Sequence, residues 1–441
     1  MIAYRHKTVV NIAMCKFKTI VYTFLCLFGI IQPAQAYIDP GTGSMLFSIV
    51  LCSITTVFFL LNSLIIKFKT RLFSEKSLSK NHHKFVIYSE GNQYYSVFKP
   101  VLDEFEARQI PVTYYTSSEN DNILNEKYDY ISSSYIGSGN KAYLKLAFLN
   151  ADVCLMTTPQ LDVLQLKRSK NVRHYCNILH SIGFSLDYRL FALDYYDSVL
   201  CDAEYQIPLI REIEQKRNLT PKILKVVGST YMDFNKKNVQ NVNDERDEKF
   251  TVLVAPTWGQ FSLLNKFGTE LLDKLSHSDF RIIVRPHPQS LKVEKNIIDE
   301  LRNKYKNVEN ISWDFSSDNL KTMSESDVMI SDFSSIMMDY SFLFKKPFLY
   351  VDTDIDFDYY DCSDLDEKPP WKFKTIEEIG RKLNINNEDI SNIVEIINEV
   401  RQDNHLVQKI EDACNYAWQC KGEAAANVVN FLIKIQKEVC S

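Results

Sequence analysis

Downstream of residue 84, apolar positions come in short continuous runs separated by polar stretches. Such runs, bounded by turn residues, predict strands buried on both faces of a parallel sheet. In the first half of the chain the runs are Phe85–Tyr88, Val112–Tyr115, Val153–Met156, Ser198–Cys201 and Lys225–Gly228. Between them, apolar residues recur at helical spacing, as in Val97, Val101, Leu102 and Phe105. This β–α–β alternation predicts a Rossmann-like domain over residues 84–235.

The second half repeats the pattern after a polar segment, Phe234–Lys249, where we place an inter-domain linker. The predicted strands are Phe250–Val254, Arg281–Val284, Asn310–Trp313, Val328–Ile330 and Phe348–Val351. They predict a second Rossmann-like domain over residues 250–374. Residues 375–441 lack strand signals and indicate amphipathic helices that pack back on the domains, for example Ile376–Leu383 and Ala424–Val439. The expected fold class is α/β, with a ligand cleft between two domains.

The first 70 residues have the character of a membrane-targeting region. Residues 1–36 contain the uncharged run Ile20–Ile31 and end in Ala34-Gln35-Ala36, a small-x-small pattern typical of signal-peptidase sites. Residues 37–70 contain a turn and then Met45–Ile66, which is uncharged over 22 residues and followed by basic residues. At ~1.5 Å per residue this run is long enough to cross a bilayer core of ~30 Å.

Two topologies fit this region. Either the first run is a cleaved signal and one transmembrane helix remains, which we favour, or both runs form a hairpin through a periplasmic turn. Basic residues mark the cytoplasmic side, so both topologies predict anchoring in the inner (cytoplasmic) membrane with the catalytic part in the cytoplasm. The alternative is that Met45–Ile66 is a buried helix of a soluble protein. The membrane is therefore an expected partner.

Composition narrows the class of protein. The 441 residues are 45% hydrophobic and 24% charged, as in globular proteins, and the net charge of −5 gives no reason to expect nucleic acid as a partner. The ten cysteines include no C-x-x-C pair and no cluster with zinc spacing, so we predict no resident metal and leave a loosely held Mg²⁺ ion open. No P-loop, G-x-G-x-x-G or G-x-S-x-G motif is present.

Two predicted strands run directly into residues that handle phosphate. Arg281–Val284 leads into Arg285-Pro286-His287-Pro288, where the prolines fix the backbone around an imidazole that can donate a hydrogen bond to phosphate. The alternative for His287 is a structural turn with a surface histidine. Val328–Ile330 leads into Ser331-Asp332-Phe333-Ser334-Ser335 at the start of a helix, where an anion is favoured.

Asp339 lies one helical turn after Ser335 and shares its face, so it is a candidate for accepting ribose hydroxyls or orienting a serine. The alternative for any one of these polar residues is a helix N-cap. Ligands of open α/β sheets bind at the carboxyl ends of strands, so the two segments together predict a nucleotide-diphosphate site.

His180 is the candidate from the first domain. It follows an apolar run and precedes Ser181 and Gly183, which is typical of a strand end facing a cleft. The alternative is a histidine hydrogen-bonded in the core or in a turn. His174 competes with it but lies in a more strand-like context.

Three segments in the same order carry a resemblance to a family. Ala255-Pro256-Thr257-Trp258, Arg285-Pro286-His287-Pro288 and Ser331-Asp332-Phe333-Ser334-Ser335 with Asp339 resemble the CDP-glycerol glycerophosphotransferase family of teichoic-acid priming and polymerising enzymes. The resemblance covers roughly residues 170–350. It implies a GT-B-like fold and transfer of a glycerol-phosphate-type unit from a CDP-linked donor to a hydroxyl acceptor.

The resemblance also implies roles for individual residues. His180 would act as the base that takes the acceptor's proton, and His287 with Arg285 would stabilise charge on the phosphates and the leaving nucleotide. The implied donor-binding residues are Arg285, Ser331, Ser334, Ser335, Asp339 and Thr257. Some positions depart from the family pattern: Leu179 and Ile182 replace a Trp and a Thr around the first histidine, and Gly259-Gln260 replaces an Arg-Asp.

The expected function is therefore a membrane-anchored phosphotransferase that adds an alditol phosphate to a lipid-linked or surface glycan, with CMP as leaving group. One alternative is a nucleotide-sugar glycosyltransferase or epimerase of the same fold. The other is a non-catalytic module that binds a nucleotide or a glycan. The sequence does not indicate which alditol or acceptor is used, or whether units are polymerised.

Overall fold

The computed structural model describes residues 55–57, 81–239, 249–316, 319–332, 334–351, 357–368, 370–384 and 389–441. The chain divides into two units, Met1–Phe73 and Ser74–Ser441. Apart from residues 55–57, the predicted segments 1–36 and 37–70 lie outside the described residues, and so does most of the expected span Met45–Ile66. Among the residues that are described, no helix combines the length and apolarity needed to cross a bilayer.

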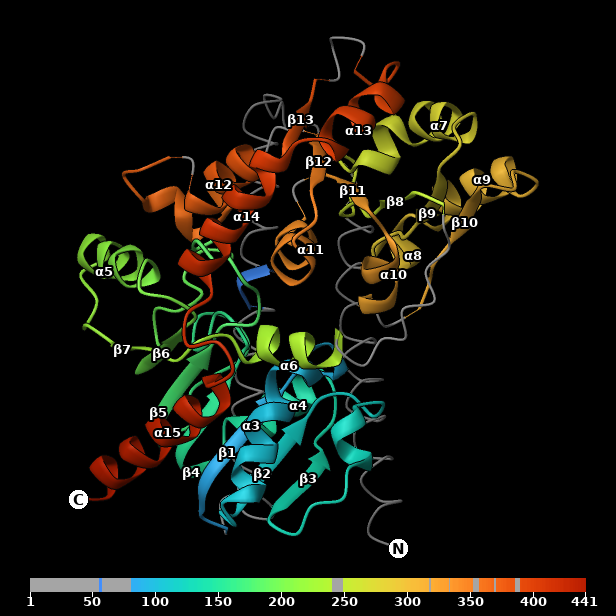
Figure 1. Ribbon diagram of the computed structural model, residues 1–441. Helices are drawn as coiled ribbons and strands as arrows, with labels where there is room; N and C mark the ends of the chain where they lie inside the picture. Colours follow the sequence, from blue (N-terminus) through green and yellow to red (C-terminus); the bar gives the residue numbers. More distant parts are fainter. Residues whose placement is uncertain are drawn as a thin grey trace, which may run out of the picture. The chain divides into compact units, whose positions relative to one another are not determined.

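The first lobe of the second unit is built on a seven-stranded sheet in which every strand pairs in parallel (Figure 1). The strand order is β3-β2-β1-β4-β5-β6-β7. This is the Rossmann arrangement, in which the order of successive strands across the sheet reverses between β1 and β4. The strands are β1 His83–Ser89, β2 Val112–Thr116, β3 Ile131–Tyr135, β4 Asn150–Met156, β5 Asn171–Ile178, β6 Ser198–Cys201 and β7 Ile223–Val226. The helices are η1 Asn92–Tyr94, α3 Tyr95–Ala107, η2 Asn122–Asn125, α4 Asn140–Leu146, α5 Gln206–Lys216 and α6 Thr230–Val239.

Alternating side chains of these strands enter two separate cores, one on each face of the sheet. On one face, Ile87 and Leu155 pack with α3 and with the last helix of the chain. On the other face, Tyr88 and Cys154 pack with residues of α4 and α5. Because a strand presents successive residues to opposite faces, burial on both sides explains why the strands are continuous apolar runs.

The second lobe repeats the plan with a six-stranded parallel sheet of order β10-β9-β8-β11-β12-β13. Its strand order reverses between β8 and β11. Its strands are β8 Thr251–Val254, β9 Arg281–Val284, β10 Ile311–Trp313, β11 Val328–Ser331, β12 Phe348–Val351 and β13 Arg381–Leu383. Its helices are α7 Leu263–Ser276, α8 Ser290–Val293, α9 Lys295–Tyr305, α10 Leu320–Glu325, α11 Ile336–Phe344, α12 Trp371–Ile379, α13 Ile393–Arg401 and α14 Asn404–Ala417. The short helices η3 Phe357–Tyr359 and η4 Asp361–Asp364 follow β12 and pack against the first lobe. The predicted α/β class with two parallel sheets is confirmed.

One prediction about the C-terminal region is wrong. The segment after Lys374 contains a strand, β13, where the sequence indicated helices alone. The expected helix Ile376–Leu383 ends at Ile379, and Gly380 begins the extended backbone of the sixth strand. At Gly380 a Cβ atom would lie 2.3 Å from the ring of Phe348, so the chain comes too close to β12 there for any larger residue.

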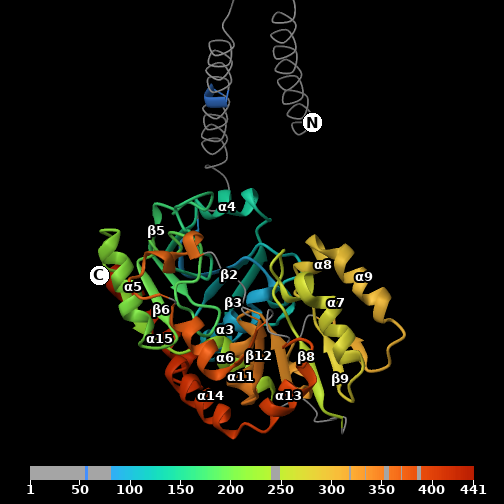
Figure 2. The ribbon, with the colours of Figure 1, turned by 90° about the horizontal axis from the view of Figure 1, so that it is seen from above.

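The last helix, α15 (Ala424–Cys440), returns to the first lobe and packs beside α3 and β4 (Figure 1). Asp233 of α6 fixes this crossing, because its carboxylate accepts hydrogen bonds from the backbone N–H groups of Gly422 (2.8 Å) and Ala424 (3.1 Å). α6 itself packs against α3 of the first lobe and against α10 and α11 of the second lobe, and Figure 2 shows α3, α6 and α11 close together from a second direction. The carboxyl ends of both sheets therefore approach one another around α6.

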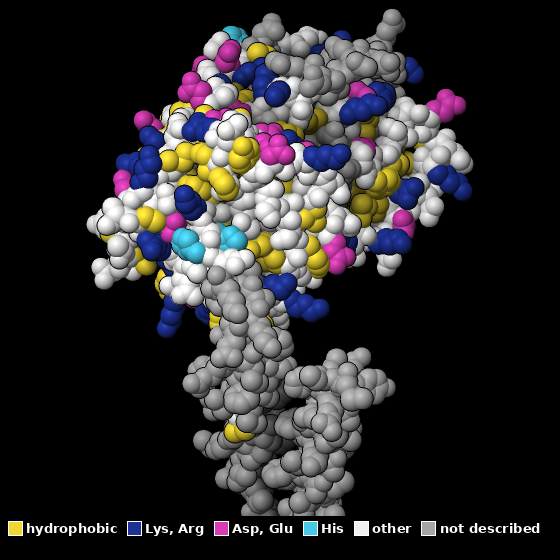
Figure 3. Space-filling view, turned by 90° about the horizontal axis from the view of Figure 1, so that it is seen from below, with side chains coloured by type: hydrophobic (Ala, Val, Ile, Leu, Met, Phe, Trp, Pro, Cys, Tyr) yellow, Lys and Arg dark blue, Asp and Glu magenta, His cyan; other side chains and the backbone are white. Residues whose placement is uncertain are grey.

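The chain enters the first sheet at its amino edge. His83 opens β1 and hydrogen-bonds Thr113 (2.8 Å), and His82 lies 3.1 Å from the buried carboxylate of Asp152. The view from below shows Lys and Arg side chains interspersed with Asp and Glu rather than gathered in one patch (Figure 3). His82 and the first residue of β1 thus lie at the edge opposite the one where ligands of this fold bind.

Candidate active site

The motifs singled out in the sequence follow neighbouring strands of the second sheet. Thr257 follows β8, His287 follows β9 and Asp332 follows β11, and β8 lies between β9 and β11. All three strands are parallel, so their carboxyl ends lie at one edge, at the point where the strand order reverses. This is where ligands of doubly wound sheets bind.

Asp332 holds this edge together. Its carboxylate is fully buried and accepts hydrogen bonds from the backbone N–H groups of Thr257 (2.9 Å) and Leu263 (3.0 Å). Burial raises its pKa to about 6, although these backbone hydrogen bonds oppose the shift. Asp332 therefore ties the loop after β8 to the turn that opens α11, a role that the sequence suggested only as a possible helix cap.

The three serines of this turn differ in their surroundings. The Ser331 hydroxyl is buried and donates to the carbonyl of Ala255 (2.6 Å), so it braces β11 against β8. Ser334 and Ser335 are half-buried at the start of α11. The Ser334 hydroxyl lies 3.5 Å from the backbone N–H of Ile336. Ser335 accepts a hydrogen bond from the Lys372 ammonium (2.7 Å).

His287 is half-buried, and its two ring nitrogens have different roles. Nδ1 accepts a hydrogen bond from the backbone N–H of Gln289 (3.1 Å), so in the neutral ring the proton lies on Nε2. Burial lowers its pKa, and the charge of Glu294 opposes this effect. Glu294 also accepts from the N–H of Gly259 (2.8 Å), which links the His287 segment to the same loop that Asp332 holds.

Arg285 and Asp339, both expected to bind the donor, have partners within the protein. The Arg285 guanidinium forms an ion pair with Asp314 and donates to the carbonyl of Ser316 (2.8 Å). Burial alone would raise the pKa of Asp314, but hydrogen bonds and the Arg285 charge lower it to about 2. Asp339 accepts from the Tyr231 hydroxyl (2.7 Å), and burial raises its pKa to about 6. Through these contacts Arg285 and Asp339 stabilise the walls of the site.

His180 lies at the carboxyl end of β5, in the wall of a cavity of about 610 Å³ in the first lobe. Tyr188 stacks on its ring and the Tyr188 hydroxyl lies 2.8 Å from Nδ1, while Tyr94 meets it edge-on at 4.9 Å. Burial lowers the pKa of His180 to about 4, with Asp187 opposing, so the imidazole is neutral at pH 7. His174, by contrast, is buried within β5 and hydrogen-bonds Ser198 (2.8 Å).

No pattern in the sequence pointed to Lys372, which joins the two lobes at this point. Its ammonium group lies 2.8 Å from the Asp187 carboxylate, beside His180, and 2.7 Å from the Ser335 hydroxyl. It is only 4% exposed. Its partners are 185 and 37 positions away in the chain, so no local pattern could reveal it. In the described part of the chain, no group of three or more His, Cys, Asp or Glu side chains is arranged to hold a metal ion.

Comparison with known families decides between the interpretations. The family model described as CDP-glycerol:poly(glycerophosphate) glycerophosphotransferase matches residues 220–413. The match includes all three motifs of the second lobe, and it confirms the resemblance found in the sequence. It indicates an enzyme of the glycerophosphotransferase type.

Solved structures support the fold. The structure of the wall teichoic acid polymerase TagF is 15% identical over 88% of this chain and 98% of that chain, with a TM-score of 0.56. A TagF variant soaked with CDPG is 16% identical over 89% of this chain and 99% of that chain, with a TM-score of 0.54. At this level of identity the likeness concerns the fold. No curated protein sequence matches the chain.

Proposed function

We propose that this glycerophosphotransferase moves an alditol phosphate from a CDP-linked donor to a hydroxyl of a lipid-linked or surface glycan. The observation that carries the proposal is the pairing of a neutral imidazole, His180, with the start of α11 through Lys372. A base that serves the acceptor and a helix start that favours phosphate are thus connected by one buried cation. The CDPG-soaked TagF structure supports the choice of donor class.

The reaction follows from the side chains of both lobes. With the His180 Nδ1–H donating to the Tyr188 hydroxyl (2.8 Å), Nε2, which lies 3.4 Å from the same hydroxyl, takes the proton of the acceptor hydroxyl. The acceptor oxygen then attacks the distal phosphorus of the donor, and the bond from that phosphorus to the CMP oxygen breaks with its electron pair remaining on CMP. His287, with its proton on Nε2, donates a hydrogen bond to the phosphate oxygens. Positioning and fixed positive charge supply most of the rate enhancement in phosphoryl transfer.

The proposal places the enzyme at the inner face of the cytoplasmic membrane, on the basis of the uncharged run Met45–Ile66 and the basic residues that follow it. A lipid-linked acceptor would be presented at the same surface. Fractionation of producing cells tests this part independently. Recovery of the full chain in the washed cytosolic fraction, with none in the membrane fraction, would contradict it.

The decisive experiment offers the purified full chain a panel of CDP-alditols and UDP-sugars, with membranes of the producing cells as acceptor source. We expect release of CMP from a CDP-alditol and no release of UDP. His287→Ala should abolish turnover while leaving donor binding largely intact, which separates an enzyme from a binding module. Release of UDP alone would reject the proposal in favour of a nucleotide-sugar enzyme. Repeating the assay with EDTA tests whether Mg²⁺ accompanies the donor.

A further inference from the structure

We infer that Lys372 is the positioning residue that couples the acceptor-side histidine to the donor-side serine. This inference rests on the proposed function and extends it to a residue that lies outside the three sequence motifs. Lys372 is the second residue of α12, and three groups hold it. Its backbone N–H donates to the Ser185 hydroxyl (3.2 Å), and its ammonium contacts Asp187 and Ser335.

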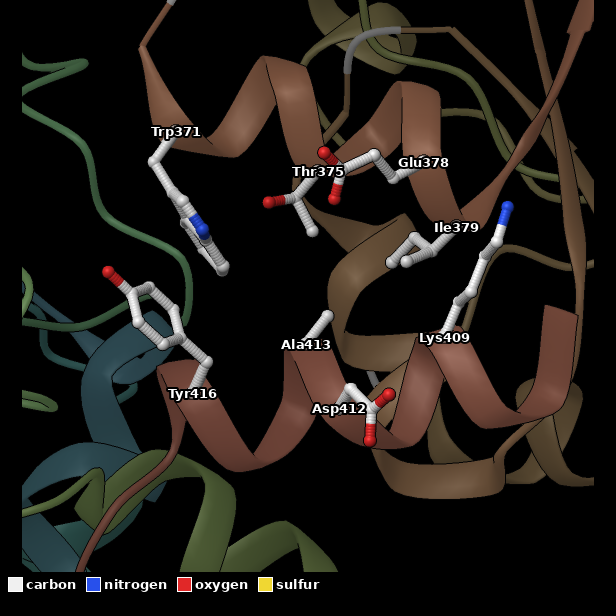
Figure 4. Close-up of a pocket in the computed structure, with 8 residues that line it drawn as sticks. All are labelled: Trp371, Thr375, Glu378, Ile379, Lys409, Asp412, Ala413 and Tyr416. Atoms are coloured by element: carbon white, nitrogen blue, oxygen red, sulfur yellow. The ribbon is translucent and has the colours of Figure 1, made fainter.

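The first turn of α12 is anchored from the other side by aromatic packing. Figure 4 shows Trp371 and Tyr416 facing each other at one end of the groove between α12 and α14. Their ring centroids are 5.4 Å apart, and Tyr205 of the first lobe packs on Trp371 at 4.6 Å. Because Trp371 is fixed by rings from both lobes, the neighbouring lysine has little freedom to leave the site.

On the donor side, Lys372 determines how Ser335 can bind an anion. An ammonium group has donors and no acceptor, so the hydroxyl oxygen of Ser335 must accept the hydrogen bond. The hydroxyl hydrogen of Ser335 is then left to donate elsewhere. At the start of α11, which spans nine residues from Ile336 to Phe344, the helix favours an anion as that acceptor. Lys372 therefore prepares Ser335 to donate to a donor phosphate.

On the acceptor side, Lys372 keeps Asp187 ionised. Burial would raise the pKa of Asp187, but the Lys372 charge and hydrogen bond lower it. The Asp187 charge in turn raises the pKa of His180, against the larger effect of burial. Lys372 thus maintains the carboxylate charge that raises the pKa of His180. The other titratable or charged groups around this histidine are Glu90, Tyr94, Tyr143, Tyr188, Arg189 and Tyr360.

The test compares variants of the full chain in the CMP-release assay. For Lys372→Met we expect kcat/KM for CDP-glycerol to fall about 10- to 100-fold, the effect of losing a hydrogen bond to a charged group at each end. The acid limb of the pH profile should move down by about one pH unit, because burial then protonates Asp187 and the charge that raised the pKa of His180 is lost. Lys372→Arg keeps the charge and should recover most of the activity.

Two partner variants separate positioning from general damage. Adding Asp187→Asn to Lys372→Met should move the acid limb no further, because the carboxyl group is already neutral without Lys372. Adding Ser335→Ala to Lys372→Met should raise the donor KM no further than either single change, because both act on one hydroxyl. Lys374→Met is the matched control, since Lys374 lies on the same helix and pairs with Glu367 at the surface.

The outcomes are distinguishable. An acid limb that stays in place in Lys372→Met, together with additive effects on the donor KM, would overturn the inference. Should Lys372→Met fail to fold, Ser335→Ala and Asp187→Asn test each half alone: the first should raise the donor KM, and the second should lower the pKa of His180 in an NMR titration. A wild-type chain that releases UDP and no CMP defeats the proposed function instead, and the same variants are then compared by UDP release.

Discussion

Asp202 offers a quantitative test of the buried electrostatics, because its pKa is among the most strongly shifted carboxyl values in the first lobe. It follows β6, is 2% exposed, and lies 3.5 Å from the side-chain amide nitrogen of Gln206. Burial raises its pKa from 3.8 to about 8, and the charge of Asp233 adds to the shift, while hydrogen bonds from Gln206 and Ser229 oppose it. At pH 7 the folded protein therefore carries a proton on this carboxyl group, whereas the unfolded chain does not.

The sign of the effect follows from proton binding. Between pH 4 and pH 8 the folded state binds one more proton than the unfolded state at this site, so the free energy of unfolding falls as pH rises. The slope is about 1.4 kcal/mol per pH unit. The side chain of Asp202→Asn has the same shape and does not titrate, so the variant's free energy of unfolding lacks this contribution to its pH dependence. Between pH 5 and pH 7 the wild type should therefore lose about 2–3 kcal/mol of stability relative to the variant.

The assay is urea unfolding of wild type and Asp202→Asn at pH 5, 6, 7 and 8, with the comparison made at each pH so that all other titrations cancel. Asp197→Asn is a suitable control, because Asp197 is ion-paired to Arg168 at a partly exposed site. A stability difference between wild type and Asp202→Asn that stays constant across this range would refute the argument that the buried carboxyl group is protonated.

Two further predictions concern the packing between lobes and helices. Tyr231→Phe removes the hydroxyl group that donates a hydrogen bond to the Asp339 carboxylate (2.7 Å), so it should raise the pKa of Asp339 further. It should also lower the free energy of unfolding at pH 7, measured by urea unfolding, by about 1–3 kcal/mol. Gly228→Ala should lower the thermal midpoint much more than Gly422→Ala: both glycines have a left-handed backbone (φ of 89° and 82°), but only at Gly228 would the new Cβ meet a backbone oxygen, that of Gln419, at 2.6 Å. Equal shifts for the two glycine variants would show that contact with Gln419 is unimportant.

The sequence predicted most central strands well, although it missed β5, and it missed the edge strands β3 and β13 for a physical reason. Strands such as β9 and β12 are covered on both faces, so they must be continuous apolar runs and their predicted bounds agree with the structure. β3 and β13 lie at the ends of their sheets and are partly exposed, so their sequences contain serines, an arginine and a lysine. Nothing in a polar run of three to five residues distinguishes such a strand from a loop.

The sequence predicted which motifs form the candidate site. It did not predict which groups each side chain of those motifs contacts. The positions of Ser331, Arg285 and Asp339 at strand ends and a helix start are what a phosphate site requires. The structure shows that the same groups are satisfied by Ala255, Asp314 and Tyr231. A hydroxyl or a carboxylate at such a position serves either the ligand or the fold, and only the arrangement of distant segments decides which.

That arrangement also explains how the site manages without a glycine-rich loop. Buried aspartates hold the loops by accepting backbone N–H groups: Asp332 holds those of Thr257 and Leu263, and Asp361 holds those of Phe191 and Ala192. Loops fixed in this way are ordered before any ligand arrives, so little of the donor's binding free energy is needed to order them.

The carboxylates that give this order also add negative charge around a site proposed to bind a diphosphate. A buried cation is therefore required to offset them, and Lys372 lies between a carboxylate and the start of α11. The same reasoning predicts that charge at position 372 matters more than shape. Lys372→Arg should keep most of the activity, whereas the similarly sized but neutral side chain of Lys372→Met should not. Equal activity of these two variants would show that the site owes its affinity for phosphate to the helix start alone.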